Sequence, residues 1–483
     1  MSADTKATVR GLVIGGEIAA AASGKTYADI YPGDGSETAQ IPAGDREDVD
    51  RAVTAARRAL AGPWGTMNVA DRAQALRRLG DAIMANADEM ARLETLDTGK
   101  PLAEARAIDV PMSADLFYYY AGAALTLEGH TIPVKGPFFH YTVREPLGVV
   151  GLIVPWNFPL LIGSRKVAAA LAAGNAVILK PASESPLTAL KLGELALEAG
   201  LPAGALNVVS GAGRTAGAAI VAHPGIAGVS LTGSTETGKM IMRDAAATMK
   251  RLHLELGGKS PNIVFADADL DTAAKYAMAA IFYNKGEVCT AGSRLFVEKK
   301  VHDDLVGRIV ERTKKLAPGD PFDAKTRLGP LVSAGQLEKV LGYVEAGKRE
   351  GARLVAGGDR VDRAGFYMNP TIFDGVTNEM TIAREEIFGP VLSVLDFDDE
   401  ESVIAAANAS EYGLAAAIWT SDVKRAHRVA SRLHAGTVWV NTYNNYDAAS
   451  PYGGLKSSGF GRESGREAFE FYSQSKSVWI NLK

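Results

Sequence analysis

The only cysteine of the 483-residue chain, Cys289, lies in the segment Phe282 to Arg294, which reads FYNKGEVCTAGSR. The segment is polar, contains Gly286 and Gly292, and follows an apolar run, Tyr276 to Tyr283, that is typical of a helix. A cysteine used only for packing usually lies inside a hydrophobic run, whereas glycines let the backbone approach a ligand closely. Because a thiolate is intrinsically nucleophilic, this position favours a reactive cysteine over the more common inert thiol.

Three further motifs accompany this segment in a fixed order along the chain. They are PWNFP at Pro155 to Pro159, LELGGKSP at Leu254 to Pro261 and EEIFGP at Glu385 to Pro390. Together with the cysteine segment, they resemble the aldehyde dehydrogenase family in order, spacing and overall length, over essentially the whole chain. Several ordered motifs are a more specific signal than any one of them. The resemblance implies oxidation of an aldehyde to a carboxylic acid with NAD or NADP and water.

Three side chains match the chemistry that this oxidation needs. Cys289 as the nucleophile converts the flat carbonyl group into a tetrahedral alkoxide that expels hydride. Asn157, at a predicted strand end, is expected to donate its side-chain amide to the oxyanion alongside the backbone N–H of Cys289. Glu255 ends an apolar strand just before two glycines, and the resemblance makes it the general base that activates water to hydrolyse the thioester.

Simpler interpretations exist for individual residues of this set. Asn157 is of a type common in turns, and a lone glutamate such as Glu255 is more often a solvated surface charge. Lys166 matches a family lysine near the catalytic centre, but a lysine on a helix surface is an equally simple interpretation. The occurrence of Asn157 and Glu255 in one ordered set with Cys289 favours the catalytic interpretation for both.

The chain from Val149 to Leu256 alternates apolar strands with helix-length segments. Strands are predicted at 149–154, 176–179, 206–209, 229–231 and 252–256. Such alternation predicts a doubly wound α/β fold, in which ligands bind beyond the carboxyl ends of the parallel strands. A second unit of the same kind runs from Asn262 to about Val440. Upstream, helices are predicted from Asp45 to Leu60, with Asp45 as the cap, and from about Val69 to Leu96.

Glycines after two of these strands favour a dinucleotide site, because helix N-termini there meet a pyrophosphate. The resemblance implies a cofactor domain of variant Rossmann geometry. The resemblance implies that Ser234 contacts phosphate, that Lys180 contacts the adenosine ribose, and that Glu386 and Phe388 hold the nicotinamide half. The residues expected to bind NAD or NADP are Trp156, Lys180, Ser183, Gly213, Gly217, Gly233, Ser234, Glu386 and Phe388.

Ser183 bears on the choice between the two cofactors. Many NAD-specific members of the family place a glutamate three residues after the lysine that matches Lys180, where it repels a 2′-phosphate. This chain has Ser183 there and Glu184 one residue later, so the repulsive charge is displaced. We therefore expect NADP to be accepted besides NAD. The alternative is that Ser183 only caps the helix that begins near Pro186.

The expected substrate tunnel is mostly aromatic. By motif position it is lined by Phe158, Arg165, Tyr283, Tyr446 and Tyr452. Aromatic walls favour an aryl or medium-length aliphatic aldehyde. Arg165 leaves a semialdehyde or hydroxyaldehyde as an alternative, since family members that act on these also carry arginine there. Tyr283 stands where a second arginine would be expected, which weakens the carboxylate case, and Arg165 pairing with a helix carboxylate is a further interpretation.

The length of 483 residues predicts two or three domains in a globular chain with 47% hydrophobic and 22% charged residues. We predict a cofactor-binding domain at 1–125 and 147–256, a catalytic domain at 257–455, and an oligomerisation arm with a C-terminal strand at 126–146 and 456–483. Residues 130–143 are expected to form a hairpin, and the terminal strand SVWINL to join the arm of a neighbouring subunit. The resemblance implies a homodimer or homotetramer.

Composition argues against several other classes of function. A net charge of -4 without a basic block argues against nucleic-acid binding, and no apolar stretch is long enough to span a membrane. With no signal-peptide pattern at the N-terminus, we expect a cytoplasmic protein. No histidine has metal-ligand spacing with Cys289, so no metal is expected. A CoA-acylating relative and a non-catalytic cofactor-binding protein remain alternatives, and the presence of Glu255 and Cys289 argues against them.

Overall fold

The first unit is built on an eight-stranded sheet whose central strands are apolar and buried. The structure is a computed structural model that describes residues 6–8 and 11–483. The strand order is β2-β1-β8-β7-β6-β9-β10-β20. The bounds are β1 Leu12–Ile14, β2 Glu17–Ala19, β6 Val149–Ile153, β7 Ala176–Lys180, β8 Leu206–Val208, β9 Gly228–Thr232, β10 Arg251–Glu255 and β20 Gly459–Phe460. The predicted parallel strands are confirmed to within one residue at each end.

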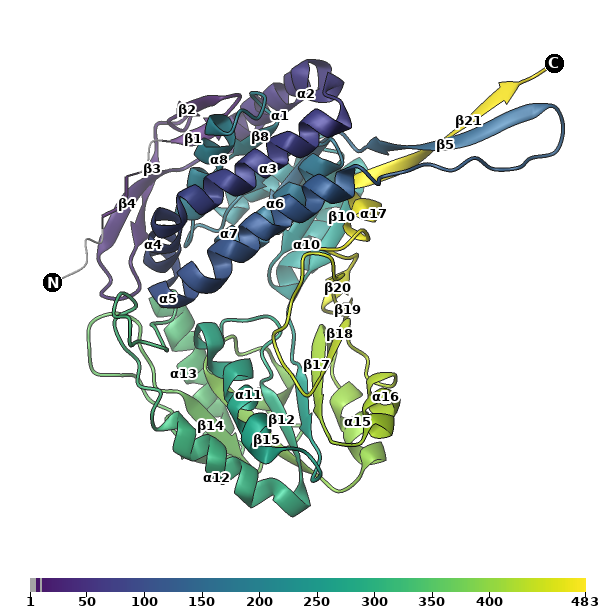
Figure 1. Cartoon of the computed structure of the whole chain (residues 1–483). Helices are drawn as coiled ribbons and strands as arrows, with labels where there is room; N and C mark the ends of the chain where they lie inside the picture. The colour runs from purple at the N-terminus through teal and green to yellow at the C-terminus, as the bar shows by residue number, and fades with distance from the viewer. Residues whose placement is uncertain (1–5, 9–10) are drawn as a thin grey trace.

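Helices pack on this sheet, and α3, α6 and α7 lie side by side in one layer (Figure 1). The bounds are α1 Arg46–Ala61, α2 Pro63–Thr66, α3 Val69–Ala85, α4 Ala87–Thr98, α5 Leu102–Glu104, α6 Val110–Ala124, α7 Pro159–Ala172, α8 Leu187–Glu198, α9 Ala218–Ala222 and α10 Thr235–Ala245. Asp45 caps α1 as predicted, accepting a hydrogen bond of 2.9 Å from the backbone N–H of Glu47.

The single long helix predicted from about Val69 to Leu96 is wrong. Asn86 interrupts it with φ -108° and ψ 24°, and its side-chain amide donates to the carbonyl of Ala82 at 2.8 Å. Asparagine competes for backbone hydrogen bonds in this way, which ends α3 and lets α4 begin in a new direction.

The second unit contains a seven-stranded sheet with the order β13-β14-β15-β12-β11-β17-β18 (Figure 1). Its strands are β11 Pro261–Val264, β12 Arg294–Glu298, β13 Arg353–Ala356, β14 Thr371–Asp374, β15 Val391–Phe397, β17 Ala415–Trp419 and β18 Thr437–Val440. Its helices are α11 Leu270–Phe282, α12 His302–Thr313, α13 Ala334–Arg349, α14 Thr381–Arg384, α15 Glu400–Asn408 and α16 Val423–Ala430. All neighbouring strands are parallel except β13 with β14, which confirms a second doubly wound unit. Smaller antiparallel pairs are β3 Thr26–Ile30 with β4 Glu37–Pro42 and β16 Tyr412–Gly413 with β19 Leu455–Lys456.

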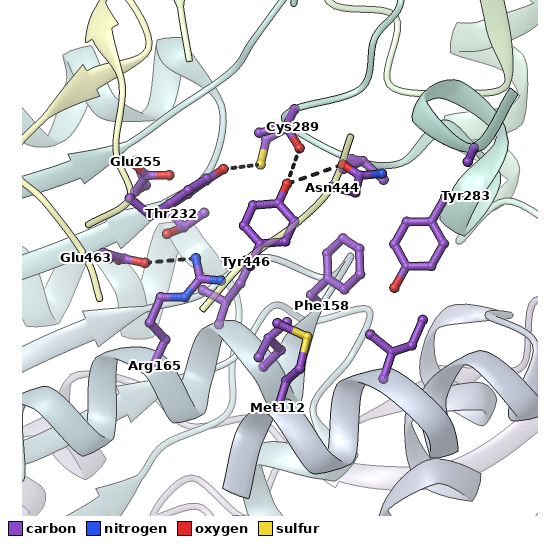
Figure 2. A pocket seen from close by; sticks show the side chains of 17 residues that line it. Met112, Phe158, Arg165, Thr232, Glu255, Tyr283, Cys289, Asn444, Tyr446 and Glu463 are labelled. Atoms are coloured by element: carbon purple, nitrogen blue, oxygen red, sulfur yellow. Dashed lines mark hydrogen bonds and ion pairs between the residues drawn. The ribbon is translucent and has the colours of Figure 1, made fainter. Parts of the chain in front are cut away.

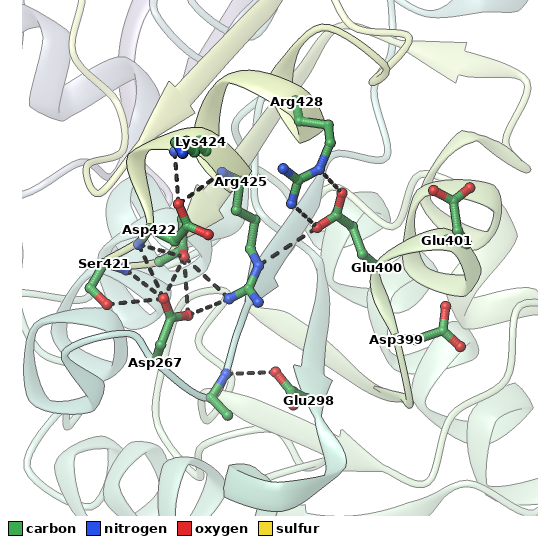
Figure 3. Close-up of polar contacts among 12 residues, drawn as sticks. Asp267, Glu298, Asp399, Glu400, Glu401, Ser421, Asp422, Lys424, Arg425 and Arg428 are labelled. Atoms are coloured by element: carbon green, nitrogen blue, oxygen red, sulfur yellow. Dashed lines mark hydrogen bonds and ion pairs between the residues drawn. The ribbon is translucent and has the colours of Figure 1, made fainter.

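A polar cluster fastens α15 and α16 to the ends of two neighbouring strands (Figure 3). Asp267 follows β11 and accepts hydrogen bonds from the hydroxyl of Thr420, which follows β17, and from the guanidinium of Arg425, each at 2.8 Å. The guanidinium of Arg428 in α16 forms two hydrogen bonds, of 2.5 and 2.7 Å, with Glu400 in α15. The charges at the strand ends therefore hold the helices in register with the sheet.

A two-stranded ribbon extends away from the body of the molecule (Figure 1). It consists of β5 Phe138–Pro146 and β21 Ser473–Asn481, paired antiparallel over their full lengths. The terminal strand therefore pairs with β5 of its own chain, which corrects the expectation that it joins a neighbouring arm. The predicted hairpin at 130–143 is present in a short form, because its two halves meet at the antiparallel bridge of Thr131 with Tyr141. The backbone N–H of Ile132 donates to the carbonyl of His140 at 3.1 Å, and that of Thr142 donates to the carbonyl of His130 at 2.8 Å. The short buried helix α17 Ala468–Tyr472 delivers the chain beside Pro146 and makes the internal pairing possible.

The segment before β21 differs from the predicted division into domains. We placed all of 456–483 with the arm, but β20 pairs antiparallel with β10 and so extends the sheet of the first unit. The side chains of α17 are mostly buried and belong to the main hydrophobic core. Only β21 therefore lies with the arm, and the other domain boundaries stay predictions. No helix in the part of the chain that the structure describes is long and apolar enough to cross a membrane.

The arm predicts self-association of the chain. Its ribbon exposes Phe138, Phe139, Trp479 and Ile480, so its apolar side chains and free strand edges can be buried against a second copy. Deleting residues 478–483 should lower the apparent mass measured by sedimentation, whereas Val423→Ala, at an exposed apolar residue outside the arm, should not. A full-length protein that sediments as a monomer at micromolar concentration would contradict the prediction.

Candidate active site

All five predicted tunnel residues line one cavity of about 220 Å³ (Figure 2). The cavity also contains Cys289 and Glu255 and draws its walls from both units. The sequence missed other residues of its lining, which are Ile108, Met112, Leu161, Ile162, Thr232, Ala279, Val288, Thr290, Asn444 and Glu463. Val288 and Thr290 flank Cys289 in its motif, whereas most of the others are apolar residues of helices, which carry no motif of their own.

Cys289 follows a sharp turn between α11 and β12. Asn284 and Lys285 have φ values of 43° and 60°, so two consecutive non-glycine residues adopt the left-handed conformation. The buried Lys285 ammonium donates to the carbonyl of Thr98 at 2.8 Å and pairs with Glu287 at 3.0 Å. These contacts stabilise the strained turn, which would adopt a less strained conformation without them.

The side-chain amide of Asn157 lies against the same turn. Its nitrogen donates to the carbonyl of Glu287 at 2.9 Å, and the Asn157 carbonyl accepts from the amide of Asn284 at 3.0 Å. An amide nitrogen carries two N–H groups, so one remains for a ligand. Asn157 and Cys289 both line a second cavity, described below. The structure therefore brings the predicted nucleophile and oxyanion donor to one wall.

The thiol of Cys289 is neutral in this environment. Burial, then the nearby carboxyl groups of Glu255 and Glu386, raise its pKa to about 12. The Sγ atom lies 3.2 Å from the hydroxyl oxygen of Tyr452. Reaction at neutral pH therefore requires stabilisation of the thiolate by neighbouring groups.

Glu255 ends β10, on the same side of the cavity as Cys289 (Figure 2). Its side chain is buried, and burial, followed by the charge of Glu463, raises its pKa to about 8. Its Oε1 atom has no hydrogen-bond partner among the described residues. A buried carboxyl group with a free oxygen and a pKa near the working pH suits a general base and not a solvated surface charge.

Lys166 is not on a helix surface, because its side chain is fully buried in α7. Its ammonium donates to the hydroxyl of Ser230 at 2.7 Å and pairs with Glu463. Lys166 is absent from the lining of either cavity, so the structure places it behind the tunnel wall. Although burial opposes ionisation, Lys166, then His253 and Arg165, hold the pKa of Glu463 below its usual value.

Arg165 lines the tunnel but is already paired. Its guanidinium lies 3.5 Å from Glu463 and 4.9 Å from the ring centre of Tyr452. Its partner is not the helix carboxylate considered from the sequence, since Glu463 lies in an extended segment bridged to Tyr452.

A second cavity, of about 190 Å³, meets the first at Cys289 and at Thr232. It contains five of the predicted cofactor residues, Trp156, Gly233, Ser234, Glu386 and Phe388, together with Pro155, Leu256, Gly257, Gln336 and Lys339, which were not predicted. The rings of Trp156 and Phe388 meet edge to face at 5.2 Å.

The lining of this second cavity fits a dinucleotide. Ser234 caps α10, so the N-terminus of a helix faces the region where phosphate would lie. Glu386 accepts a hydrogen bond of 2.9 Å from the backbone N–H of Gly258. A Cβ atom on Gly257 would lie 2.5 Å from the Glu386 carboxylate, so a larger residue there would displace that carboxylate.

The remaining predicted cofactor residues form a separate group at the carboxyl end of β7 and in the loops beside it. The Lys180 ammonium donates to the carbonyl of Pro181 at 2.6 Å, and a Cβ atom on Gly217 would lie 3.6 Å from the Lys180 side chain. Gly213 opens the short helix that ends at Gly217. These residues do not line the second cavity.

Ser183 does not cap α8. The cap position is Pro186, and the backbone N–H of Leu187 donates to the carboxylate of Asp97 at 2.9 Å. The Ser183 hydroxyl lies instead 3.5 Å from the carbonyl of Gly211, beside the Lys180 group. The alternative considered from the sequence is therefore wrong.

Comparisons with known proteins identify the family of the chain. The model of the aldehyde dehydrogenase family matches residues 18–478. The Bacillus subtilis protein DhaS, which is named as an aldehyde dehydrogenase, is 48% identical over 98% of this chain and 96% of its own. The NAD+ complex of an aldehyde dehydrogenase from Bacillus cereus superposes with a TM-score of 0.97 at 47% identity, over 99% of this chain and 97% of that one.

A further solved structure carries a ligand besides the cofactor. The indole-3-acetaldehyde dehydrogenase AldA of P. syringae, in complex with NAD+ and IAA, superposes with a TM-score of 0.96 at 47% identity. The alignment covers 98% of this chain and 97% of that one. The chain thus belongs to the aldehyde dehydrogenase family and is an NAD(P)-dependent oxidoreductase.

Proposed function

We propose that this enzyme oxidises aryl or medium-length aliphatic aldehydes to carboxylic acids through a thioester on Cys289. The observation that carries the proposal is the one cavity in which Cys289 and Glu255 lie among Phe158, Tyr283, Tyr446 and Tyr452. An aryl group suits such walls because ring contacts stabilise it beyond simple burial. The likeness to an indole-3-acetaldehyde dehydrogenase supports the aryl assignment.

The first half of the reaction uses the turn that carries Cys289. The thiolate attacks the carbonyl carbon, and the developing alkoxide accepts hydrogen bonds from the free N–H of the Asn157 amide and from the Cys289 backbone N–H. Because the carbonyl of Glu287 already holds the Asn157 amide, the donor needs no reorganisation during the step. NAD or NADP, when bound by the predicted residues, accepts the hydride that the alkoxide expels.

The second half uses Glu255, which lines the same cavity as Cys289. Its ionised carboxylate takes a proton from water, and the resulting hydroxide attacks the thioester carbon, which releases the acid and the thiolate. The free Oε1 atom of Glu255 is the acceptor available for that water. Lys166 acts indirectly, because its ammonium group neutralises the buried carboxylate of Glu463, which lies near Glu255.

Arg165 does not favour a carboxylate-bearing aldehyde, because Glu463 already neutralises it. The semialdehyde and hydroxyaldehyde alternatives therefore rank below the aryl and aliphatic ones. Release of the acyl group to CoA ranks lower still, since Glu255 is present to activate water. We further propose that the chain assembles as a homodimer or homotetramer through its arm and acts in the cytoplasm.

A substrate panel tests the proposed specificity. With NAD in excess, phenylacetaldehyde and hexanal should give kcat/KM values at least about tenfold above succinic semialdehyde, a difference of roughly 1.4 kcal/mol in transition-state stabilisation.

Cys289→Ala should abolish turnover of every aldehyde while leaving cofactor binding intact. A preference for the semialdehyde would refute the substrate class, and residual turnover above a tenth of the parent rate in Cys289→Ala would refute the nucleophile.

The pKa of Glu255 predicts a rise of activity with pH. A carboxyl group is a base only when ionised, so a pKa of about 8 means that the rate of thioester hydrolysis should increase from pH 6 to pH 9. Glu255→Gln should remove this rise, slow turnover by about a hundredfold or more, and leave an acyl adduct on Cys289 visible by mass spectrometry. Unchanged turnover in that variant would return Glu255 to a structural role.

Ser183 predicts acceptance of NADP. Burial lowers the pKa of Lys180 to about 8, so its ammonium form persists at neutral pH and can pair with a 2′-phosphate. We expect kcat/KM with NADP to lie within about tenfold of that with NAD. Ser183→Glu should shift the preference strongly to NAD, whereas Ser183→Ala should not. An enzyme that discriminates against NADP by a thousandfold or more would show that other groups set the choice.

A further inference from the structure

The sulfur of Cys289 has one hydrogen-bond partner in the part of the chain that the structure describes, the hydroxyl of Tyr452 at 3.2 Å. The other groups around the sulfur act in different directions. Glu255 and Glu386 oppose the negative charge of a thiolate, whereas Arg165 favours it. A hydrogen-bond donor aimed at this sulfur is therefore the contact best placed to offset the two carboxyl groups.

Tyr452 is the donor in this contact whenever the thiol of Cys289 is ionised. Burial, then the proximity of Cys289, raise the pKa of its hydroxyl well above the usual value, so the phenol stays protonated over the working pH range. No other hydrogen bond is recorded for this hydroxyl among the described residues. A neutral phenol facing a thiolate can only donate, and a hydrogen bond to an ionised acceptor is about twice as strong as one between neutral groups.

The ring of Tyr452 is held on two sides. Its backbone N–H donates to the carbonyl of Glu463 at 2.6 Å, and the N–H of Glu463 donates back at 2.7 Å. The guanidinium of Arg165 lies over the ring face, 4.9 Å from its centre, and the carboxylate of Glu463 lies 3.5 Å from the guanidinium. Glu463 thus fixes both the backbone of Tyr452 and the cation that covers its ring, which leaves the hydroxyl one direction in which to point.

Tyr446 provides a contrast on the same wall. Its hydroxyl lies 2.7 Å from that of Thr290 and 3.4 Å from the side chain of Asn444 (Figure 2). Among the described residues it forms no hydrogen bond with the sulfur. The two tyrosine rings meet edge to face at 5.8 Å. They therefore share the cavity and its burial but differ in what their hydroxyl groups touch.

We propose that Tyr452 is a catalytic residue that donates a hydrogen bond to the Cys289 thiolate, and that Arg165, held by Glu463, positions its ring and adds positive charge behind it. The proposal rests on the proposed role of Cys289 as nucleophile. It assigns Arg165 to activation of the thiol and not to recognition of a substrate carboxylate. Figure 2 shows the sequence of contacts from Glu463 through Arg165 to the cavity that contains Cys289.

Alkylation of the thiol tests the proposal directly. Because the chain has one cysteine, iodoacetamide reports on Cys289 alone, without substrate or cofactor. The rate of alkylation is measured from pH 6 to pH 11 in the parent, in Tyr452→Phe and in Tyr446→Phe. In Tyr452→Phe we expect about tenfold slower alkylation at pH 8, the effect of raising the thiol pKa by roughly one unit. Tyr446→Phe should stay within about twofold of the parent, since its hydroxyl does not contact the sulfur.

A second variant separates the contribution of the cation. Arg165→Met keeps the length of the apolar stem but removes the charge, so it should also slow alkylation at pH 8. Adding Tyr452→Phe to Arg165→Met should then reduce the rate by clearly less than the same change does in the parent, because the two residues act on one charge. Equal effects in the two backgrounds would overturn the role given to Arg165.

The outcomes distinguish this proposal from the proposed function. A rate of alkylation in Tyr452→Phe equal to or faster than that of the parent, in a variant whose thermal unfolding matches the parent, overturns the role of Tyr452. Equal slowing by Tyr446→Phe would do the same, because it would show a general effect of the cavity. Turnover that persists in Cys289→Ala would instead refute the nucleophile itself and leave the measured thiol pKa values standing.

Discussion

The turn that carries Cys289 depends on a buried ion pair. Asn284 and Lys285 adopt the left-handed conformation, at a cost of order 1–3 kcal/mol each for non-glycine residues. The pairing of Lys285 with Glu287, and its contact with Thr98, hold the chain there. Loss of either charge would leave the other buried and unpaired, at about 3–5 kcal/mol. Because the carbonyl of Glu287 also binds Asn157, the same pair sets the spacing of the proposed nucleophile and the proposed oxyanion donor.

Burial acts in the same direction on the proposed nucleophile and on the proposed base. It raises the pKa of Cys289 to about 12 and that of Glu255 to about 8, so both groups are neutral more often than in water. A cavity closed enough to enclose a thioester therefore suppresses the ionisation on which its own chemistry relies. Two positive charges lie close to this cavity, because Glu463 forms ion pairs with both Lys166 and Arg165. Both cations are buried.

Local sequence patterns predicted the secondary structure well wherever a local interaction decides it. The five parallel strands predicted for the first sheet are runs of apolar residues between helical segments, and the cap at Asp45 needs only its own neighbours. The one long helix failed at Asn86, because whether an asparagine interrupts a helix depends on what its side chain can bond to. The sequence did not predict that β21 pairs with β5 of its own chain. An apolar strand can pair with any free strand edge, in its own chain or in another, so its sequence does not identify the partner.

The sequence by itself determined the family, because the four ordered motifs that contain Asn157, Glu255, Cys289 and Glu386 can be recognised along the chain without its fold. It also located the aromatic tunnel by motif position. Only the tertiary structure decided which group Arg165 and Lys166 pair with, since their partner Glu463 lies 297 positions beyond Lys166. A contact between residues so far apart leaves no local pattern, and an isolated glutamate in a glycine-rich loop resembles any surface charge until folding buries it among cations.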